Sequence, residues 1–190
     1  MSSPLPCSVE FDAHSGTIPA ATERYQKRLS ELRGLFLDAE ALEVRIRAEN
    51  DPICYEIYAF NENDAEGDLF FGTTIIYPGK VGAEYHLTRG HYHRKRQHAE
   101  TYQPLSGRGL VLFEREDGAT RTADLMPGKV TYIPPFWAHR SVNTSDVPLI
   151  FLWTCSVQAG HDYASIAERG MRLVVLERNG KPSVEERPGS

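Results

Sequence analysis

The feature that most constrains the fold is a series of short segments, beginning near residue 53, that are rich in β-branched and aromatic residues. Such segments favour β-strands, because branched and ring side chains pack well on a pleated surface. Turn sequences such as NENDAEG, PGKVG, EDGA and MPG separate them. We expect strands at residues 53–60, 68–78, 84–88, 109–114, 129–134, 149–157 and 172–178. Short strands spaced by turns predict a mainly β sandwich or barrel rather than alternating βαβ units.

The first fifty residues follow a different pattern. Apolar residues recur at helical spacing in segment 21–36, namely Tyr25, Leu29, Leu32 and Phe36, which predicts a helix with one apolar stripe. A second short helix is expected in 38–50, beginning after Asp38. Because no repeat or flexible linker divides the chain, we expect one domain. It would comprise an N-terminal strand or helical segment over 1–50, a barrel over 51–178 and a tail over 179–190.

Composition excludes several classes of protein. No apolar run approaches the roughly 18 residues that a membrane span needs, and the beginning of the sequence lacks the apolar stretch of a secretory signal, so a cytoplasmic location is expected. A net charge of −5 argues against nucleic acid or an anionic membrane as partner. The three cysteines, Cys7, Cys54 and Cys155, are far apart and suggest neither a disulfide framework nor a zinc ribbon.

Histidines are concentrated in GHYHRKRQHAETY, residues 90–102. On a strand, His91 and His93 point the same way, about 7 Å apart. Glu100 follows in the same stretch, and His139 lies further on in PGKVTYIPPFWAHRSVN. Three imidazoles and one carboxylate suit Fe, Mn, Ni or Zn and leave coordination positions open for water or substrate. A solvated strand face carrying two histidines is the competing interpretation of an HxH pair alone.

The remaining histidines carry weaker signals. His98 lies between the candidate ligands and is expected to be an exposed loop residue, and His14 is expected at the surface. His86 could face either side of its strand.

Two longer motifs favour the metal interpretation. The pattern H-x-H-x6-E-x6-G from His91, followed by G-x5-P-x3-A-H-x3-N from Gly128, resembles the two motifs of the cupin superfamily. The resemblance implies a small jelly-roll-like β-barrel holding one metal on three histidines and a glutamate. The chain departs from the general pattern in two places: six residues rather than three or four separate His93 from Glu100, and Phe136 stands where glycine is usual.

A narrower resemblance covers about residues 8–180. The segments YEIYAF, EGDLFFGTTIIYPGKVG, LTRGHYH, AETY, PPFWAHRSVN and AGHDY are together similar to the cupin-type glucose-6-phosphate isomerases. This similarity implies a homodimer with one divalent transition metal per subunit, Fe²⁺ first, with Mn²⁺, Ni²⁺ or Zn²⁺ as alternatives. It implies no nucleic-acid or membrane partner.

The same resemblance assigns residues to roles. The implied metal ligands are His91, His93, Glu100 and His139. The implied phosphate neighbours are Tyr55, Thr73, Thr88 and Gly90. The implied sugar neighbours are Tyr102, His161 and Tyr163, with Glu100, Tyr102 and His161 expected to be catalytic. A tyrosine that the family has near the phosphate is replaced by Cys155, which would remove a hydroxyl donor.

Strand geometry sets one condition on these assignments. Strict alternation puts Thr88 and Gly90 on the opposite face from His91 and His93. If all four line one cavity, a bulge at Gly90 is required.

The implied reaction is aldose–ketose isomerisation of a sugar phosphate, glucose 6-phosphate to fructose 6-phosphate. A metal with open positions can act as a Lewis acid on the C1 and C2 oxygens, while hydrogen moves either as a proton through an enediolate or as a hydride. Glu100 is the candidate base, but coordination to a cation lowers its basicity. The alternatives are another metal-cupin activity, meaning a different sugar-phosphate isomerase or an oxygenase, and a non-catalytic sugar-binding cupin.

Overall fold

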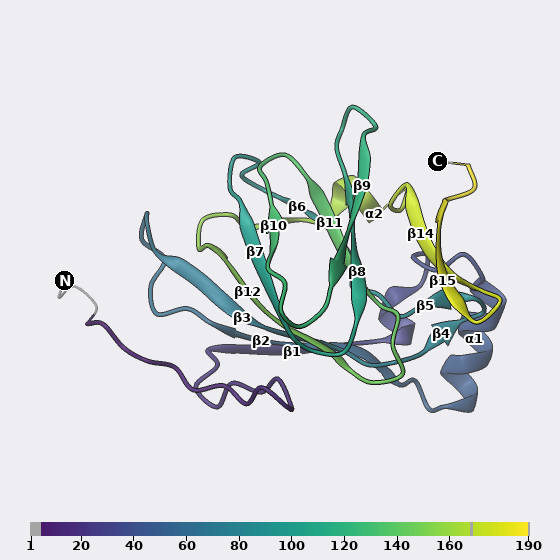
Figure 1. Ribbon diagram of the computed structural model, residues 1–190, viewed down its shortest axis with the longest axis horizontal. Coiled ribbons are helices and arrows are strands. Elements are labelled where there is room, and N and C mark those ends of the chain that lie inside the picture. Colours follow the sequence, from purple (N-terminus) through teal and green to yellow (C-terminus); the bar gives the residue numbers. More distant parts are fainter. Residues whose placement is uncertain (1–4, 168, 190) are drawn as a thin grey trace.

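A computed structural model of the chain, which describes residues 5–167 and 169–189, shows the mainly β architecture that the sequence predicts (Figure 1). The largest sheet has the strand order β1-β2-β3-β12-β7-β10, and its neighbouring strands are antiparallel. Its strands are β1 (Glu23–Arg28), β2 (Ile53–Phe60), β3 (Leu69–Ile76), β12 (Leu149–Ser156), β7 (Glu100–Ser106) and β10 (Thr131–Ile133).

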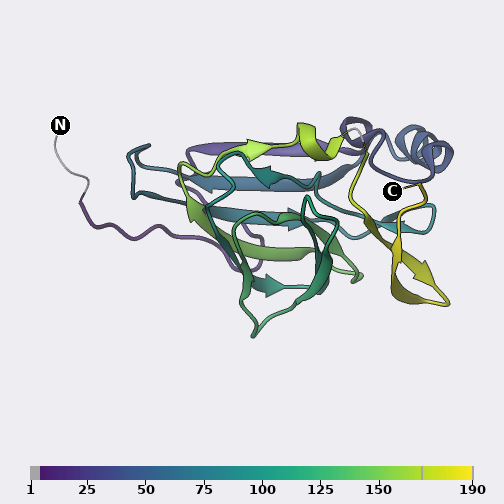
Figure 2. The same ribbon diagram turned by 90° about the horizontal axis from the view of Figure 1, so that it is seen from above.

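A second sheet faces the large one (Figures 1 and 2). It contains β11 (Ala138–Asn143), β8 (Gly109–Glu114) and β9 (Thr120–Leu125) in that order. Two isolated bridges, Leu87 to Val142 and His91 to His139, attach the chain before β6 (Tyr92–His93) to β11. β6 in turn pairs with β13 (His161–Asp162), which is followed by the short helix α2 (Ala164–Ala167). The segment that carries His91 and His93 is therefore attached to β11, the strand that carries His139.

The N-terminal segment differs from the helix predicted over residues 21–36. The structure has strand β1 there, followed by a 3-10 helix, η1 (Leu29–Leu32). β1 pairs along the edge of β2, so backbone hydrogen bonds to an open sheet edge replace those of a helix. Leu29 and Leu32, two of the apolar residues at helical spacing, belong to η1, and both are buried. The second expected helix is confirmed as α1 (Ala39–Ala48), where the Asp38 carboxylate accepts a hydrogen bond from the Ala41 N–H.

Residues 179–190, expected as a tail, contain a strand. β14 (Leu173–Arg178) and β15 (Lys181–Glu186) form a hairpin whose turn residues, Asn179 and Gly180, have φ of 54° and 74°. Positive φ at both positions is typical of the two-residue turns that suit hairpin twist. The hairpin extends a sheet with β5 (Glu84–Tyr85) and β4 (Lys80–Val81), close to α1 in Figure 1. The sequence KPSVEE has few apolar residues, so no strand was expected there.

The registers of the large sheet align side chains into rows across its inner face. One such row consists of Tyr25, Ile57, Thr74, Phe151 and Pro104. Alternation along each strand puts every second residue on this face. The buried core continues into the second sheet through Val111, Leu112 and Phe113. The cavity described below is lined by the same inner rows.

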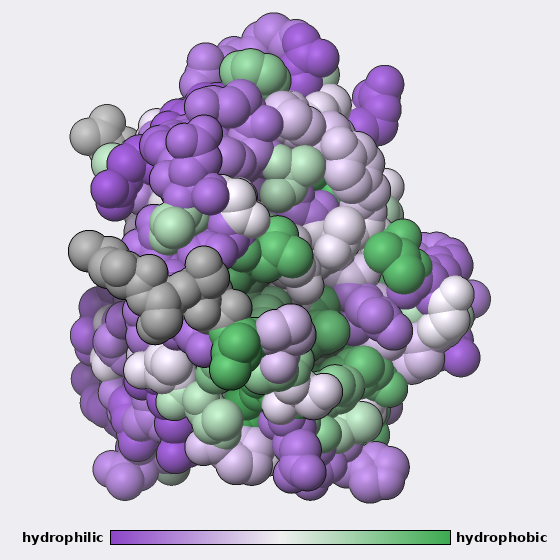
Figure 3. All heavy atoms as spheres, turned by 90° about the vertical axis from the view of Figure 1, so that its left-hand side faces the viewer, coloured by the Kyte–Doolittle hydropathy of each residue, from purple (hydrophilic) through white to green (hydrophobic). Residues whose placement is uncertain are grey.

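At the end of the molecule seen in Figure 3, apolar side chains gather in the middle, and hydrophilic side chains border them above and below. No helix within residues 5–167 or 169–189 is long and apolar enough to span a membrane.

Candidate active site

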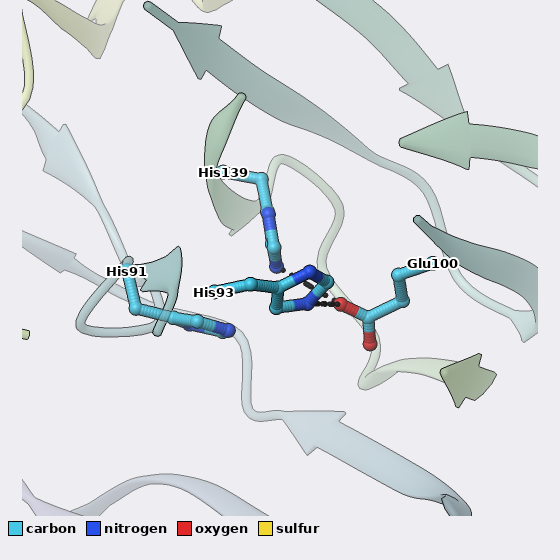
Figure 4. Close-up of side chains that lie close together, drawn as sticks. All are labelled: His91, His93, Glu100 and His139. Atoms are coloured by element: carbon cyan, nitrogen blue, oxygen red, sulfur yellow. Dashed lines mark hydrogen bonds and ion pairs between the residues drawn. The ribbon is translucent and has the colours of Figure 1, made fainter. Parts of the chain in front are cut away.

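Four side chains converge between the two sheets, as Figure 4 shows: His91, His93, Glu100 and His139. One ligand atom from each lies within 4.8 Å of the others. Glu100 Oε2 lies 3.1 Å from Nε2 of His93 and 3.1 Å from Nε2 of His139. The six-residue segment before Glu100 therefore leaves its carboxylate within reach of the histidines.

The hydrogen bonds around this cluster leave lone pairs pointing inward. His93 Nδ1 lies 2.9 Å from the His98 carbonyl, and His139 Nδ1 lies 3.5 Å from the Trp137 carbonyl. Donation from Nδ1 to a carbonyl leaves Nε2 as a base, which is how metal-binding histidines are commonly oriented. In the described structure, the buried Nε2 atom of His91 has no hydrogen-bond partner, and the Nε2 atoms of His93 and His139 both face the same Glu100 oxygen. Buried acceptors facing one another are costly unless a cation lies among them, so the cluster fits a divalent metal ion.

The electrostatics of the cluster favour an ionised carboxylate. Burial alone would raise the pKa of Glu100, but the close contacts of its carboxylate with His139 and His93 lower it to about 2. Burial, reinforced by the neighbouring histidines, lowers the pKa of His91 well below its ordinary value. A negative carboxylate beside a neutral imidazole is the protonation state that metal binding requires.

A cavity of about 360 Å³ opens beside the cluster. Its lining includes most of the predicted site residues: Tyr55, Thr88, Gly90, His91, Glu100, Tyr102, His139, His161 and Tyr163. This volume lies within the range of small-molecule sites. His93 is the one predicted ligand outside the lining; it is 5% exposed and lies behind the cavity wall, in contact with Glu100.

The chain changes direction at Gly90, as the condition on strand alternation required. Gly90 has a φ of 77°, in the left-handed region, and lies against the Arg140 side chain. Before it, Thr88 exchanges hydrogen bonds with Ser141: its N–H donates to the Ser141 carbonyl and its hydroxyl accepts from the Ser141 N–H. After it, His91 and His139 exchange backbone hydrogen bonds. The irregular backbone at Gly90 thus lets Thr88, Gly90 and His91 line one cavity.

The position of Thr73 differs from the prediction. Its hydroxyl donates to the Gly16 carbonyl on the outer side of β3, and its side chain does not line the cavity. The neighbouring Thr74 lines the cavity instead. Successive residues of a strand face opposite sides, so Thr74 rather than Thr73 presents its side chain to the cavity.

Cys155 is buried in the large sheet, beside Glu100. It is the cross-strand partner of Glu100 in β7 and of Phe70 in β3, and is 7% exposed. The rows of Trp153 and Phe151 separate it from the row of Tyr55. Burial, reinforced by the Glu100 charge, raises the pKa of its thiol, so the thiol stays protonated. Cys155 therefore lies beside Glu100 rather than beside Tyr55.

Three aromatic side chains complete the cavity wall near the His/Glu cluster. The His161 ring lies 4.5 Å from the His91 ring and stacks on Tyr163 at 5.6 Å between centroids. Tyr102 lies edge-on to His139 at 5.8 Å. Burial lowers the pKa of His161 and raises that of Tyr102 well above its ordinary value, so both side chains are neutral at neutral pH.

Two cationic residues that sequence reasoning did not assign also line the cavity: Lys27 and Arg89. Lys27 is the cross-strand partner of Tyr55, and its ammonium group lies 2.8 Å from Glu31. The Arg89 guanidinium lies 5.7 Å from the centre of the Tyr163 ring. Lys27 lies in the segment that was predicted as a helix. In the strand that forms instead, Lys27 and Tyr25 face the same side, toward the cavity. Arg89 lies between Thr88 and Gly90 in the sequence, and this position next to two implied phosphate neighbours is the signal that could have identified it.

The other histidines take structural positions. His86 is buried and bonds Arg45 at 2.8 Å through Nε2 and the Tyr77 carbonyl at 3.0 Å through Nδ1. Burial lowers its pKa to about 4. His14 is exposed, as expected, whereas His98 is half-buried rather than exposed.

Phe136 stands where the second motif usually has glycine. It adopts a φ of 70°, a region that favours glycine, and its N–H donates to the Arg96 carbonyl at 2.8 Å. The side chain is 60% exposed. The turn before His139 therefore keeps the backbone shape that glycine would adopt.

Known proteins resemble the chain over nearly its whole length. The sequence profile of the family described as Glucose-6-phosphate isomerase (GPI) matches residues 26–187. A glucose-6-phosphate isomerase of Pyrococcus abyssi is 48% identical over 183 residues, which cover 96% of each chain. One of Sinorhizobium medicae is 40% identical over 173 residues, covering 90% of this chain and 81% of the relative. Among solved structures, oxalate decarboxylase from Bacillus subtilis superposes with a TM-score of 0.46 and 22% identity, covering 57% of this chain and 26% of that one. With a family match over most of its length, the chain belongs to the glucose-6-phosphate isomerase family.

Proposed function

We propose that this chain is a metal-dependent aldose–ketose isomerase that interconverts glucose 6-phosphate and fructose 6-phosphate. The observation that carries the proposal is one cavity lined both by three members of the His/Glu cluster, His91, Glu100 and His139, and by a group of hydroxyl and cationic side chains. A divalent metal, Fe²⁺ as first candidate with Mn²⁺, Ni²⁺ or Zn²⁺ as alternatives, would supply Lewis acidity toward the C1 and C2 oxygens of the substrate.

The phosphate would be bound by the hydroxyl and cationic group. Its members are Tyr55, Thr74, Thr88, Lys27, Arg89 and the backbone at Gly90. Hydroxyl and N–H donors bind phosphate well in a confined site, and the two cations offset its negative charge. Burial raises the pKa of the Tyr55 hydroxyl, so this group stays protonated and can donate to phosphate. Binding at this end would leave C1 and C2 beside the cluster.

Three side chains are candidates to handle protons. Glu100 is ionised and could take the C2 proton and return it to C1. Neutral His161 could exchange a proton with a substrate oxygen, and Tyr102, which stays protonated, could donate a hydrogen bond to one. If hydrogen instead passes directly between the carbons as a hydride, Glu100 serves as a ligand only.

The test of function is conversion of fructose 6-phosphate to glucose 6-phosphate by the purified protein, measured with a coupled dehydrogenase. We expect turnover with the phosphorylated sugar and much weaker activity with fructose, which lacks the anionic group. Mannose 6-phosphate as sole product would favour a different sugar-phosphate isomerase. Oxygen consumption without isomerisation would favour an oxygenase, and binding without turnover a sugar-binding protein.

The displaced threonine assignment gives a matched pair of variants. Thr74→Val should raise the KM for fructose 6-phosphate about 10- to 100-fold, because a hydrogen bond to a charged group contributes about 1.5–3 kcal/mol. Thr73→Val should leave KM unchanged and lower the free energy of unfolding by about 1 kcal/mol, because it loses only the bond to Gly16. Steady-state kinetics and urea unfolding of both variants make the comparison. The opposite pattern would restore Thr73 as the phosphate neighbour.

A homodimer, implied by the resemblance, and a cytoplasmic location, expected from the composition, stay predictions. Size measurement in solution tests the first, and cell fractionation tests the second.

A further inference from the structure

The segment between His93 and Glu100, six residues long, joins the metal cluster to β13. Its residue Arg96 has a side chain that is 23% exposed and contacts several parts of the fold. One guanidinium nitrogen donates to the His93 carbonyl, and Nη2 donates to Asp162 Oδ2 at 2.7 Å. The guanidinium also lies 4.3 Å from the centre of the Tyr92 ring. Arg96 therefore connects a metal-ligand strand to the residue next to His161.

The backbone of the same segment makes matching contacts. The N–H groups of Arg94 and Lys95 donate to the carbonyls of Gly160 and Ala159, at 3.1 and 3.0 Å. The Arg96 carbonyl accepts from the N–H of Phe136, in the turn that precedes His139. A segment longer than the general cupin motif thus holds both the loop before His161 and the turn before a metal ligand.

Asp162 is prepared to receive the guanidinium. Its Oδ2 also accepts from the Ser165 hydroxyl at 2.6 Å. These bonds, Ser165 first and then Arg96, lower the pKa of Asp162 to about 2, so the carboxylate is charged at any working pH. The pair is a charge-assisted hydrogen bond between half-buried groups rather than a fully solvated ion pair.

His161 lies next to this pair, on a very short strand. β13 has only two residues and pairs only with β6, which also has two. So short a ladder is weak by itself, and the His161 ring must stay 4.5 Å from the His91 ring to face the cluster. A displacement of about 1 Å in a reacting group can cost on the order of 100-fold in rate.

We propose that Arg96 is a positioning residue that, through Asp162, holds His161 against the metal-ligand face of the cavity. The inference rests on the proposed function of His161 as a proton-transfer group.

A double-mutant cycle tests the coupling. Arg96→Met keeps most of the side-chain length but removes the charge, and should lower kcat about 10- to 100-fold with KM changed less than about twofold. Arg96→Lys keeps the charge but cannot bond both partners in the same way, so its kcat should lie between that of the parent and that of Arg96→Met. In a His161→Ala background, Arg96→Met should cost less than about twofold further, because the group it positions is gone. An undiminished loss in that background would overturn the proposal.

A measurement independent of activity tests the clamp, meaning the bond between Arg96 and Asp162. In Asp162→Asn, the amides of Arg94 and Lys95 should exchange with deuterium about tenfold faster or more, because their acceptors at Gly160 and Ala159 are no longer held. The matched control is Arg178→Met, which breaks an exposed pair with Glu185 on the distant β14–β15 hairpin and should leave both this exchange and kcat unchanged. Unchanged exchange in Asp162→Asn would refute the clamp. If the parent protein failed to isomerise, the proposed function would fall, while the exchange result would still decide whether Arg96 holds β13.

Discussion

Chelation should abolish the isomerase activity, with a loss of at least about 10³-fold, and a divalent transition metal should restore it. The reason is the chemistry of the cluster: the buried Nε2 atom of His91 has no hydrogen-bond partner, and Glu100 presents a charged carboxylate to the Nε2 atoms of His93 and His139. The measurement is turnover against metal content, counted by elemental analysis at each stage. Full activity after exhaustive metal removal would contradict the prediction.

Thermal unfolding supplies a second readout of the same site. A ligand present at about 1,000 times its dissociation constant stabilises the native state by about 4 kcal/mol, so the metal should raise Tm measurably. His139→Gln should lose both the stabilisation and the activity, because it removes one of four ligands. His14→Gln is the matched control: it alters an exposed histidine outside the cavity and should behave as the parent does.

Glu100→Gln should depress turnover about 10²- to 10⁴-fold even when metal is saturating, because a general base is typically worth that factor. The amide has nearly the shape of the carboxylate but cannot accept a proton at neutral pH. Its weaker coordination should also lower metal affinity, while His91, His93 and His139 still provide three ligands. The prediction therefore assigns Glu100 a mixed role, as ligand and as base.

The measurement is turnover of the Glu100→Gln variant across a metal titration, with bound metal counted at each point. Recovery of the parent rate at full occupancy would show that Glu100 acts only as a ligand, and direct hydride transfer would become the better mechanism. Glu56→Gln is the matched control, because this buried carboxylate bonds Arg24 and Tyr77 away from the cavity. It should change stability without changing the metal dependence of turnover.

Strand prediction from the sequence succeeded where apolar and β-branched residues are dense. The segments that became β2, β3, β8 and β12 are of this kind. The structure also contains strands β1, β7, β9 and β15, which the sequence did not predict and which are largely polar or interrupted by proline. These strands form because neighbouring strands offer backbone hydrogen-bond partners, and that interaction leaves no hydrophobic pattern in the sequence.

The chemical character of the site was determined by the sequence alone. Three histidines and one glutamate at cupin-like spacing predict a site for a hard or borderline metal, and the tertiary structure brings the four side chains together. The threonine at the cavity, the cations Lys27 and Arg89 and the place of Cys155 were decided only by the fold. The physical reason is that a strand residue faces one side or the other according to register, so a shift of a single residue, or a break such as the one at Gly90, changes what a side chain contacts. The bond between Arg96 and Asp162 joins residues 66 positions apart, and no local pattern in the sequence encodes a contact of that range.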